Sequence, residues 1–168
     1  MTGHPGKKLL FMGQEFAQLR EWSEERELDW FLLSEEPHQQ IQNWYRDLLH
    51  LYKKNPALYE LDNDPAGFEW INKDDIFRSI FSFVRHSKGK KKNLLFVCNL
   101  TPVAREDYRV GVPTKRQCKL VLNSDEKEYG GSGEKRKEIY KPVKKECDGQ
   151  KYSFAYPLPA YGVAVFEY

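Results

Sequence analysis

Cysteine, long apolar runs and a dominant sign of charge are all scarce in this sequence. Its 168 residues hold three cysteines, Cys98, Cys118 and Cys147, which are widely spaced and form no C-x-x-C pair. Such usage favours reduced thiols in a cytoplasm over a disulfide framework. No apolar run approaches the ~20 residues of a membrane helix, and residues 1–6 lack the basic-then-apolar pattern of a signal peptide. We therefore expect a cytoplasmic protein with no membrane partner.

The charge balance and the histidines exclude further classes of partner. The 27 basic and 25 acidic residues leave a net charge of +2, which is too small to argue for nucleic acid. The four histidines are scattered, so no metal site is predicted. The lysine runs Lys90–Lys92 and Lys135–Lys145 are interpreted as solvated hairpin tips and edges.

The glycine-rich stretch Tyr129–Gly133 gives no sign of a cofactor site. A phosphate-binding loop connects a strand to a helix and ends in Lys-Ser or Lys-Thr. Neither feature accompanies this stretch. We interpret it as a loop and expect no cofactor.

What the sequence does have is aromatic residues in short, regularly spaced runs. There are ten Phe, ten Tyr and four Trp. After Pro56 they gather with β-branched residues in runs separated by turn-forming clusters such as Asn72–Asp75 and Ser87–Lys90. This spacing predicts an antiparallel sandwich or barrel. The expected strands are Phe68–Asn72, Ile76–Arg85, Asn93–Leu100, Tyr108–Val112, Gln117–Asn123 and Tyr161–Tyr168.

One amphipathic helix is predicted before this region, from Ser34 to Lys54. Ser34 is a candidate capping residue, acidic residues follow it, and Pro37 stands where a missing N–H costs little. Lys53 and Lys54 suit a helix C-terminus, and Pro56 ends the helix. One apolar stripe at helical spacing is formed by Ile41, Trp44, Tyr45, Leu48, Leu51 and Tyr52. We expect this stripe, Trp44 included, to face the core.

The first apolar run raises a question about its neighbours. Leu9–Met12 leads directly into Gly13 and then into polar residues, which is typical of a strand buried on both faces. Such strands belong inside parallel sheets, with a neighbour on each side. Too little sequence precedes Leu9 to supply those neighbours.

Taken together, these segments closely resemble the C-terminal third of the 1,4-α-glucan branching enzymes, in the α-amylase superfamily. The similar segments follow the family order across nearly the whole chain, and the resemblance weakens at residues 115–119 and 134–151. The segments are Lys7–Gln18, Arg20–Trp22, Glu27–Trp30, Pro56–Asp62, Gly67–Ile71, Cys98–Pro102, Tyr108–Pro113, Leu122–Asp125 and Tyr129–Gly133.

This resemblance implies a mainly β chain, in which a C-terminal antiparallel β-sandwich follows the last strand and helix of a (β/α)8 barrel. Residues 1–55 would be the barrel remnant, and residues 56–168 the all-β C-terminal domain. The parent enzyme would cleave α-1,4 links of an α-glucan, glycogen or amylose, and re-attach the cut chain as an α-1,6 branch. Its catalytic carboxylates would come from barrel strands that precede Met1. No catalytic residue is therefore assigned, and we expect this chain alone to be inactive.

Part of the substrate site is nevertheless expected within the chain. Active sites of (β/α)8 barrels lie at the C-terminal ends of the strands, so the loop after Met12 would border the cleft. Glu15 would accept hydrogen bonds from sugar hydroxyls or hold Arg20 in place. Trp22 and Trp30 would offer aromatic faces to glucose rings. Loop packing explains either Trp at least as well, and a structural ion pair explains Arg20 better.

An independent carbohydrate-binding module is the alternative function, and another glucan-acting member of the superfamily, such as a hydrolase, is a weaker third. The module would hold glucan through Tyr108, Tyr129 and Tyr152, although edge or core packing explains these residues equally well. A barrel strand has no place in such a module. The strand therefore favours the branching-enzyme interpretation.

A barrel strand without its neighbours has a physical consequence. Its backbone groups are left unpaired and its apolar side chains wet. Residues 1–33 are therefore expected to be disordered, rearranged or paired with a second copy of the chain. The expected partners of this segment are the missing barrel portion or, failing that, a homodimer through the orphaned strand. From residue 34 onward the chain is expected to fold.

Overall fold

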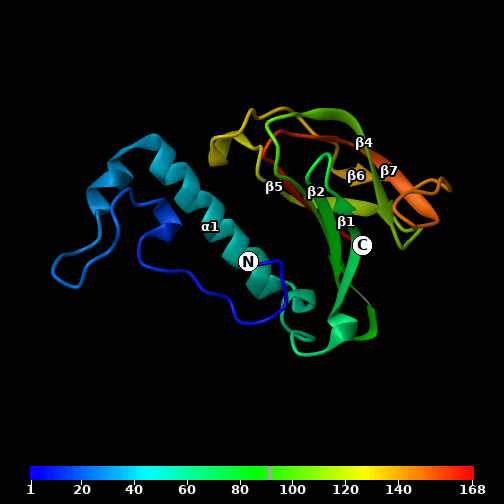
Figure 1. Cartoon of the computed structure of the whole chain (residues 1–168), viewed down its shortest axis with the longest axis horizontal. Coiled ribbons are helices and arrows are strands. Elements are labelled where there is room, and N and C mark those ends of the chain that lie inside the picture. Colours follow the sequence, from blue (N-terminus) through cyan, green and yellow to red (C-terminus); the bar gives the residue numbers. More distant parts are fainter. Residues whose placement is uncertain (91) are drawn as a thin grey trace.

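In the described part of the chain, two antiparallel sheets are accompanied by one long helix, which packs against the larger sheet (Figure 1). The computed structural model describes residues 1–90 and 92–168. Of the lysine run at 90–92, Lys91 thus lies outside the described residues. The helix is α1 (Glu36–Lys54), and the strands are β1 (Phe68–Asp75), β2 (Ile80–Arg85), β3 (Leu94–Asn99), β4 (Arg105–Val112), β5 (Cys118–Asn123), β6 (Ile139–Tyr140), β7 (Tyr152–Leu158) and β8 (Val163–Glu167).

The strands form one sheet of six and one of two. The larger sheet has the order β1-β2-β3-β8-β5-β6, and β4 pairs with β7 in the smaller sheet. Every strand pairing is antiparallel. The last strand, β8, lies in the middle of the larger sheet between β3 and β5. The predicted mainly β, antiparallel fold with one helix is confirmed.

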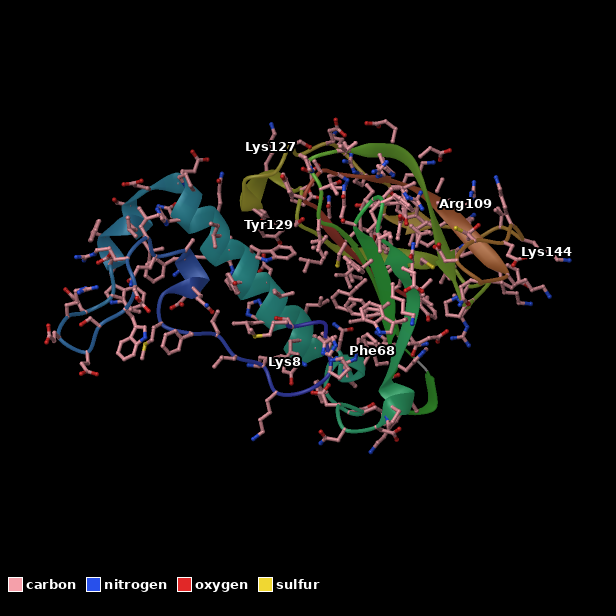
Figure 2. The ribbon with its side chains drawn as sticks, in the orientation of Figure 1. Lys8, Phe68, Arg109, Lys127, Tyr129 and Lys144 are labelled. Carbon is pink, nitrogen blue, oxygen red and sulfur yellow. The ribbon has the colours of Figure 1, made fainter. Side chains whose placement is uncertain are left out.

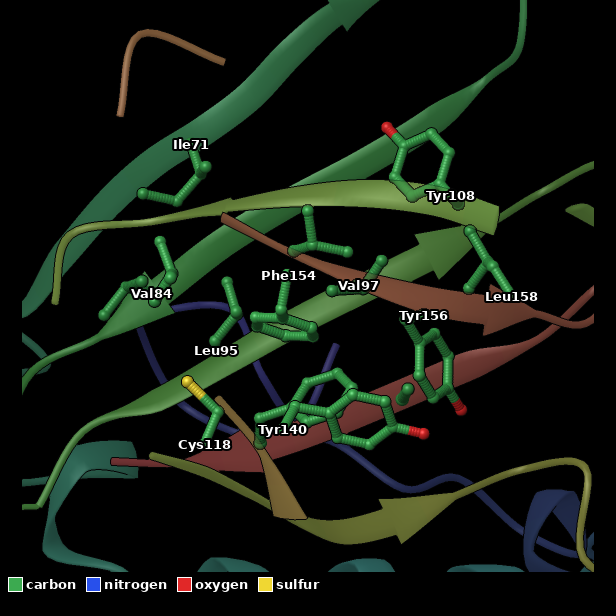
Figure 3. Close-up of a cluster of buried hydrophobic side chains, with 14 of the residues drawn as sticks. Ile71, Val84, Leu95, Val97, Tyr108, Cys118, Tyr140, Phe154, Tyr156 and Leu158 are labelled. Carbon is green, nitrogen blue, oxygen red and sulfur yellow. The ribbon is translucent and has the colours of Figure 1, made fainter. Parts of the chain in front are cut away.

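The larger hydrophobic core lies between the two sheets (Figure 3). Val110 on β4 and Phe154 on β7 are directly opposite each other in the small sheet. They face Leu95 and Phe166 of the large sheet, and all four are at least 97% buried. Burying this apolar surface stabilises the sandwich by ~25 cal/mol per Å2.

A second core covers the other face of the large sheet. It joins α1 and the turn after it to β3, β5 and β8, with Leu58, Leu94 and Val165 at its centre. Trp44 of the helix stripe packs against this core and is half-buried. Because both faces of β3 are covered, Leu94–Val97 reads as a continuous buried run, as expected of a strand between two cores.

The predicted helix exists but begins two residues later than expected. Ser34 belongs to a 3-10 turn over Trp30–Ser34, and its hydroxyl donates to the Phe31 carbonyl at 2.8 Å. It therefore does not cap α1, whose N-cap residue is Glu35 with no side-chain hydrogen bond. The other end is as predicted, because α1 stops at Lys54 before Pro56.

Four of the six predicted strands have a boundary that is wrong by two residues or more, and two strands were missed. The predicted run Ile76–Arg85 is a strand only from Ile80, because residues 76–79 form the turn between β1 and β2, in which Ser79 has a φ of 47°. The missed strands are β6 and β7. Strand β7 contains Pro157, which sequence rules place only at edges and bulges, and it does lie in the two-stranded sheet.

The predicted strand over residues 9–12 is not formed. Leu9 is 63% exposed and Met12 is 51% exposed, and the segment pairs with no strand among residues 1–90 and 92–168. A strand is stable only with a partner for its backbone groups. The N-terminal segment instead runs back along α1 (Figure 1). Of the three expected outcomes, this corresponds to the rearranged one. Pairing with a second copy, and the division of the chain at residue 55, stay predictions.

Candidate functional site

The N-terminal loop that holds the predicted site residues is fixed to α1 by Phe16. This residue ends a 3-10 turn over Gln14–Phe16 and is fully buried. Its carbonyl oxygen lies 2.7 Å from Nδ1 of His38, in the first part of α1. Gly13 precedes the turn with a φ of 86°, a conformation that favours glycine. A Cβ at Gly13 would also lie 2.9 Å from Gln18.

Arg20 forms an ion pair with Asp29, nine residues further on. Its Nε donates to Oδ2 of Asp29 at 2.9 Å, and its Nη2 donates to Oδ1. Gln18 completes the arrangement, since its Oε1 accepts from the Asp29 backbone N–H at 2.7 Å and its Nε2 donates to the Arg20 carbonyl at 2.8 Å. Asp29 is 4% exposed. The loop is thus closed by a two-pronged charged contact, the stronger kind of hydrogen-bonded pair.

The ion pair changes the protonation behaviour of both partners. Hydrogen bonds from Arg20 hold the pKa of the Asp29 carboxyl below its ordinary value. The same bonds raise the pKa of Arg20. A general acid requires the opposite displacement, a raised carboxyl pKa. Asp29 is therefore suited to hold the loop together and not to donate a proton.

A cleft of about 520 Å3 lies beside this ion pair, between the loop and α1. Two of the four predicted site residues, Arg20 and Trp22, line it. Trp22 is half-buried and meets Phe11 edge-on, with ring centroids 5.5 Å apart. The rest of the lining comes from Met1, Met12, Gly13, Gln14, Ala17, Gln18, Glu21 and Tyr45. An aromatic face with a polar rim can hold one face of a sugar ring.

The other two predicted residues, Glu15 and Trp30, do not line the cleft. Trp30 packs against Phe16 with ring centroids 5.0 Å apart, although it remains 47% exposed. Glu15 is half-buried. Sequence reasoning missed Asp29 and Tyr45 as members of the site. No spacing signal marks Asp29 as the partner of Arg20, and the position of Tyr45 on the helix stripe suggested core packing alone.

Replacing Arg20 by glutamine is expected to raise the pKa of Asp29 towards the ordinary value of about 3.9. A lowered folded-state pKa contributes stability above the unfolded pKa, and this is lost as the pH falls through the folded pKa. The variant should therefore lack this contribution at neutral pH, and its loop order should fall less on acidification than that of the parent. The Asp29 carboxyl carbon, titrated by NMR, reports the shift. Arg116→Gln, at an exposed site between β4 and β5, is the control; identical titrations of Asp29 in all three proteins would contradict the assigned ion pair.

The tyrosines of the alternative binding-module hypothesis do not form one exposed surface. Tyr108 is 5% exposed and belongs to the core between the sheets. The hydroxyl of Tyr129 donates to Oδ2 of Asp47 on α1 at 2.9 Å, and its ring meets Trp44 edge-on at 5.2 Å. Tyr152 is half-buried and packs against the core. Packing roles thus account for all three.

Metal ligands, reactive thiols and membrane-spanning helices are the other features that could mark a function. Within residues 1–90 and 92–168, no group of three or more His, Cys, Asp or Glu side chains is placed to hold a metal ion. Cys98, Cys118 and Cys147 are free thiols, and burial raises the pKa of Cys98 to about 11 and that of Cys118 to about 12. Over the same part of the chain, each helix is too short or too polar for a bilayer crossing.

Comparison with known proteins gives consistent matches along the chain. Residues 70–168 match the family described as "Alpha amylase, C-terminal all-beta domain". The whole chain is 51% identical to the 1,4-alpha-glucan branching enzyme GlgB of Butyrivibrio fibrisolvens and covers 26% of that protein. It is 44% identical to the enzyme of the same name from Aquifex aeolicus, again over the whole chain and 27% of the relative. The chain thus spans about a quarter of the length of the curated relatives it matches.

Proposed function

The chain belongs to the family of alpha amylase C-terminal all-beta domains, and from this premise we propose that it is the C-terminal part of a 1,4-α-glucan branching enzyme. The observation that carries the proposal is the 51% identity to such an enzyme along the full 168 residues. The parent enzyme would cut an α-1,4-linked glucan and transfer the cut piece to a sugar hydroxyl, forming an α-1,6 branch. Glycogen and amylose are the proposed substrates.

The chain itself would support this reaction without supplying its acids. Retaining transfer between sugars needs a nucleophilic carboxylate and a carboxylic acid about 5 Å apart. Asp29 is held in the charged form by Arg20. At Asp47, burial opposes the charge, yet hydrogen bonds from Arg46 and Tyr129 bring its pKa below the ordinary value. Neither residue is suited to be the acid, so we assign no catalytic residue to this chain.

The proposed partner of the N-terminal segment is the rest of a (β/α)8 barrel. Although Phe16 is fully buried, the segment exposes several other apolar side chains, from Leu10 at 38% exposed to Leu19 at 80% exposed. Such a concentration of exposed apolar side chains is typical of an interaction surface. In the parent enzyme, Leu9–Met12 would become the last barrel strand and the loop after Gly13 would border the active site. Pairing of two copies through the same segment is the alternative.

The proposed glucan contacts follow from that placement. Arg20 and Trp22 line the cleft beside the segment and would meet a glucan directly, while Glu15 and Trp30 would contact it from the flanks. We place the protein in the cytoplasm, and the three free thiols support a reducing compartment.

A chimera tests the parent activity. The matching C-terminal quarter of the Butyrivibrio enzyme is replaced by this chain, and α-1,6 links formed from amylose are counted after enzymatic debranching. The chimera is expected to branch amylose, and the enzyme truncated before the exchanged segment is expected to be inactive. Trp22→Ala in the chimera should weaken amylose binding about three- to tenfold, since an aromatic contact contributes ~0.5–1.5 kcal/mol.

The control in the same chimera is Trp70→Ala. Trp70 is 43% exposed but lies on β1, away from the cleft, so its removal should leave amylose binding unchanged. A folded chimera that forms no α-1,6 links would refute the proposed function. Equal effects of the two tryptophan substitutions would refute the glucan contact at the cleft.

A further inference from the structure

A second concave site lies at the far end of the sandwich from the N-terminal loop. It is a pocket of about 450 Å3 where β6 and the segment after it meet β4 and β7. Its size falls within the ~300–1,000 Å3 typical of small-molecule sites. The lining residues are Arg109, Lys137, Ile139, Tyr140, Lys141, Val143, Phe154 and Ala155.

The charge of this pocket is of one sign. Arg109, Lys137 and Lys141 line it, and among residues 1–90 and 92–168 no carboxylate does. Within the described part of the chain none of the three has an ion-pair partner, although lysine and arginine side chains close by do, such as Lys119 with Glu138 at 2.9 Å. Figure 2 shows Arg109 at this end of the molecule, together with Lys144, which does not line the pocket. Cations brought together without a counter-charge repel one another, and an anion would remove that cost.

Arg109 is positioned for such an anion by its neighbours. It is half-buried on β4, opposite Ala155 of β7. Its Nη1 donates to Oγ of Ser153 at 3.2 Å, and Ser153 in turn donates to the Lys145 carbonyl at 2.5 Å. A guanidinium has five N–H donors, and this is the one hydrogen bond that its side chain makes to the described residues. The remaining donors can form the two-pronged contact that suits phosphate.

The walls of the pocket are apolar. Ile139 and Val143 come from β6 and the segment after it, and Phe154 comes from β7. Ile139 is 38% exposed and Val143 is 53% exposed, so both have surface that a ligand can cover. A carbon body attached to the anionic group would bury this surface, whereas an inorganic ion would not.

We propose that this pocket binds a small phosphate monoester, with Arg109, Lys137 and Lys141 around the phosphate and Ile139 and Val143 against its organic part. The site is independent of the proposed branching reaction. It lies in the β-sandwich, away from the cleft at Arg20 and Trp22. A glucan carries no charge, so it would not neutralise the three cations of this pocket. The ligand therefore belongs to a different chemical class.

An NMR titration of the isotope-labelled 168-residue chain tests the site. Glucose 6-phosphate and inorganic phosphate are added separately, with glucose and potassium chloride at matched ionic strength as references. We expect saturable shifts of the Val143 and Ala155 amides with glucose 6-phosphate, with a Kd of about 1 mM or tighter, and weaker binding of inorganic phosphate. Arg109→Gln and Lys141→Gln should each weaken binding about tenfold or more, because each removes a charged contact.

The matched control is Lys144→Gln, an exposed lysine outside the lining, which should bind like the parent. Lys141 is itself exposed, so its variant is expected to fold normally even if Arg109→Gln does not. Shifts that do not saturate, that potassium chloride reproduces, or that all three variants share would overturn the phosphate site. Equal affinity for inorganic phosphate and glucose 6-phosphate would overturn the role of the apolar walls.

Discussion

Phe166→Ala is expected to lower the free energy of unfolding by about 3–5 kcal/mol, the usual cost of truncating a buried phenylalanine. Phe166 is fully buried on β8, the strand between β3 and β5. Its ring meets those of Phe154 and Tyr156 at 5.1 Å and that of Tyr140 at 5.5 Å. The substitution therefore opens a cavity between the two sheets, where β6 and β8 of the larger sheet meet β7 of the smaller one. Urea denaturation followed by tryptophan fluorescence measures the loss.

The chain offers a matched control for this substitution. Phe77 lies in the turn between β1 and β2 and is 94% exposed. Phe77→Ala makes the same chemical change without a cavity, so it should stay within about ±0.5 kcal/mol of the parent. Similar losses for the two variants would show that the aromatic cluster does not hold the sandwich together.

Asp62→Asn is expected to destabilise the protein by about 3 kcal/mol, because it leaves a buried guanidinium without its counter-charge. Arg85 on β2 is fully buried and pairs with the Asp62 carboxylate. Its other nitrogens donate to the carbonyls of Gly3 at 3.0 Å and Gly67 at 3.2 Å. These carbonyls satisfy hydrogen bonds but carry no net charge. The Arg85 cluster also joins the N-terminal segment to the sheet, so the segment should loosen first.

Glu138→Gln provides the comparison for a pair in solvent. Lys119 and Glu138 are 53% and 69% exposed, and an exposed pair contributes at most about 1 kcal/mol. Chemical denaturation gives the global loss for both variants, and amide exchange at Gly3 and Lys8 reports the release of the segment. A loss for Asp62→Asn no larger than that for Glu138→Gln would show that the Arg85 charge does not depend on Asp62.

Local patterns predicted most of the secondary structure. The helix stripe and the end at Lys54 followed from spacing and from Pro56, and β3 and β5 were placed to within two residues. The start of α1 was not predictable in this way. Ser34 has the side chain of a cap, but its hydroxyl binds Phe31 in the preceding turn, and sequence alone does not rank two local partners for one hydroxyl.

The candidate site was predictable only in part. The residue types in the loop were identified, and the interpretation of Arg20 as an ion-paired residue agrees with its contact to Asp29. The set of residues that line the cleft depends on how the loop folds over α1. As a result, Trp22 lines the cleft and Trp30 does not. The phosphate pocket had no sequence signal at all. Arg109 comes from β4, and Lys137 and Lys141 come from the two sides of β6. In the sequence, Lys137 and Lys141 belong to a lysine-rich run that was interpreted as a solvated edge.

The sequence by itself determined the fold class. Short aromatic runs, turn clusters and one amphipathic stripe specify strands, turns and a helix through residues that are close together in the chain. It also determined the family through segments preserved in order. Only the tertiary structure decided what depends on distant partners: that β8 lies between β3 and β5, that β4 pairs with β7, and that Leu9–Met12 is not a strand here. A backbone group is satisfied wherever a partner lies in space, and such partners are set by the whole fold, not by neighbours in the chain.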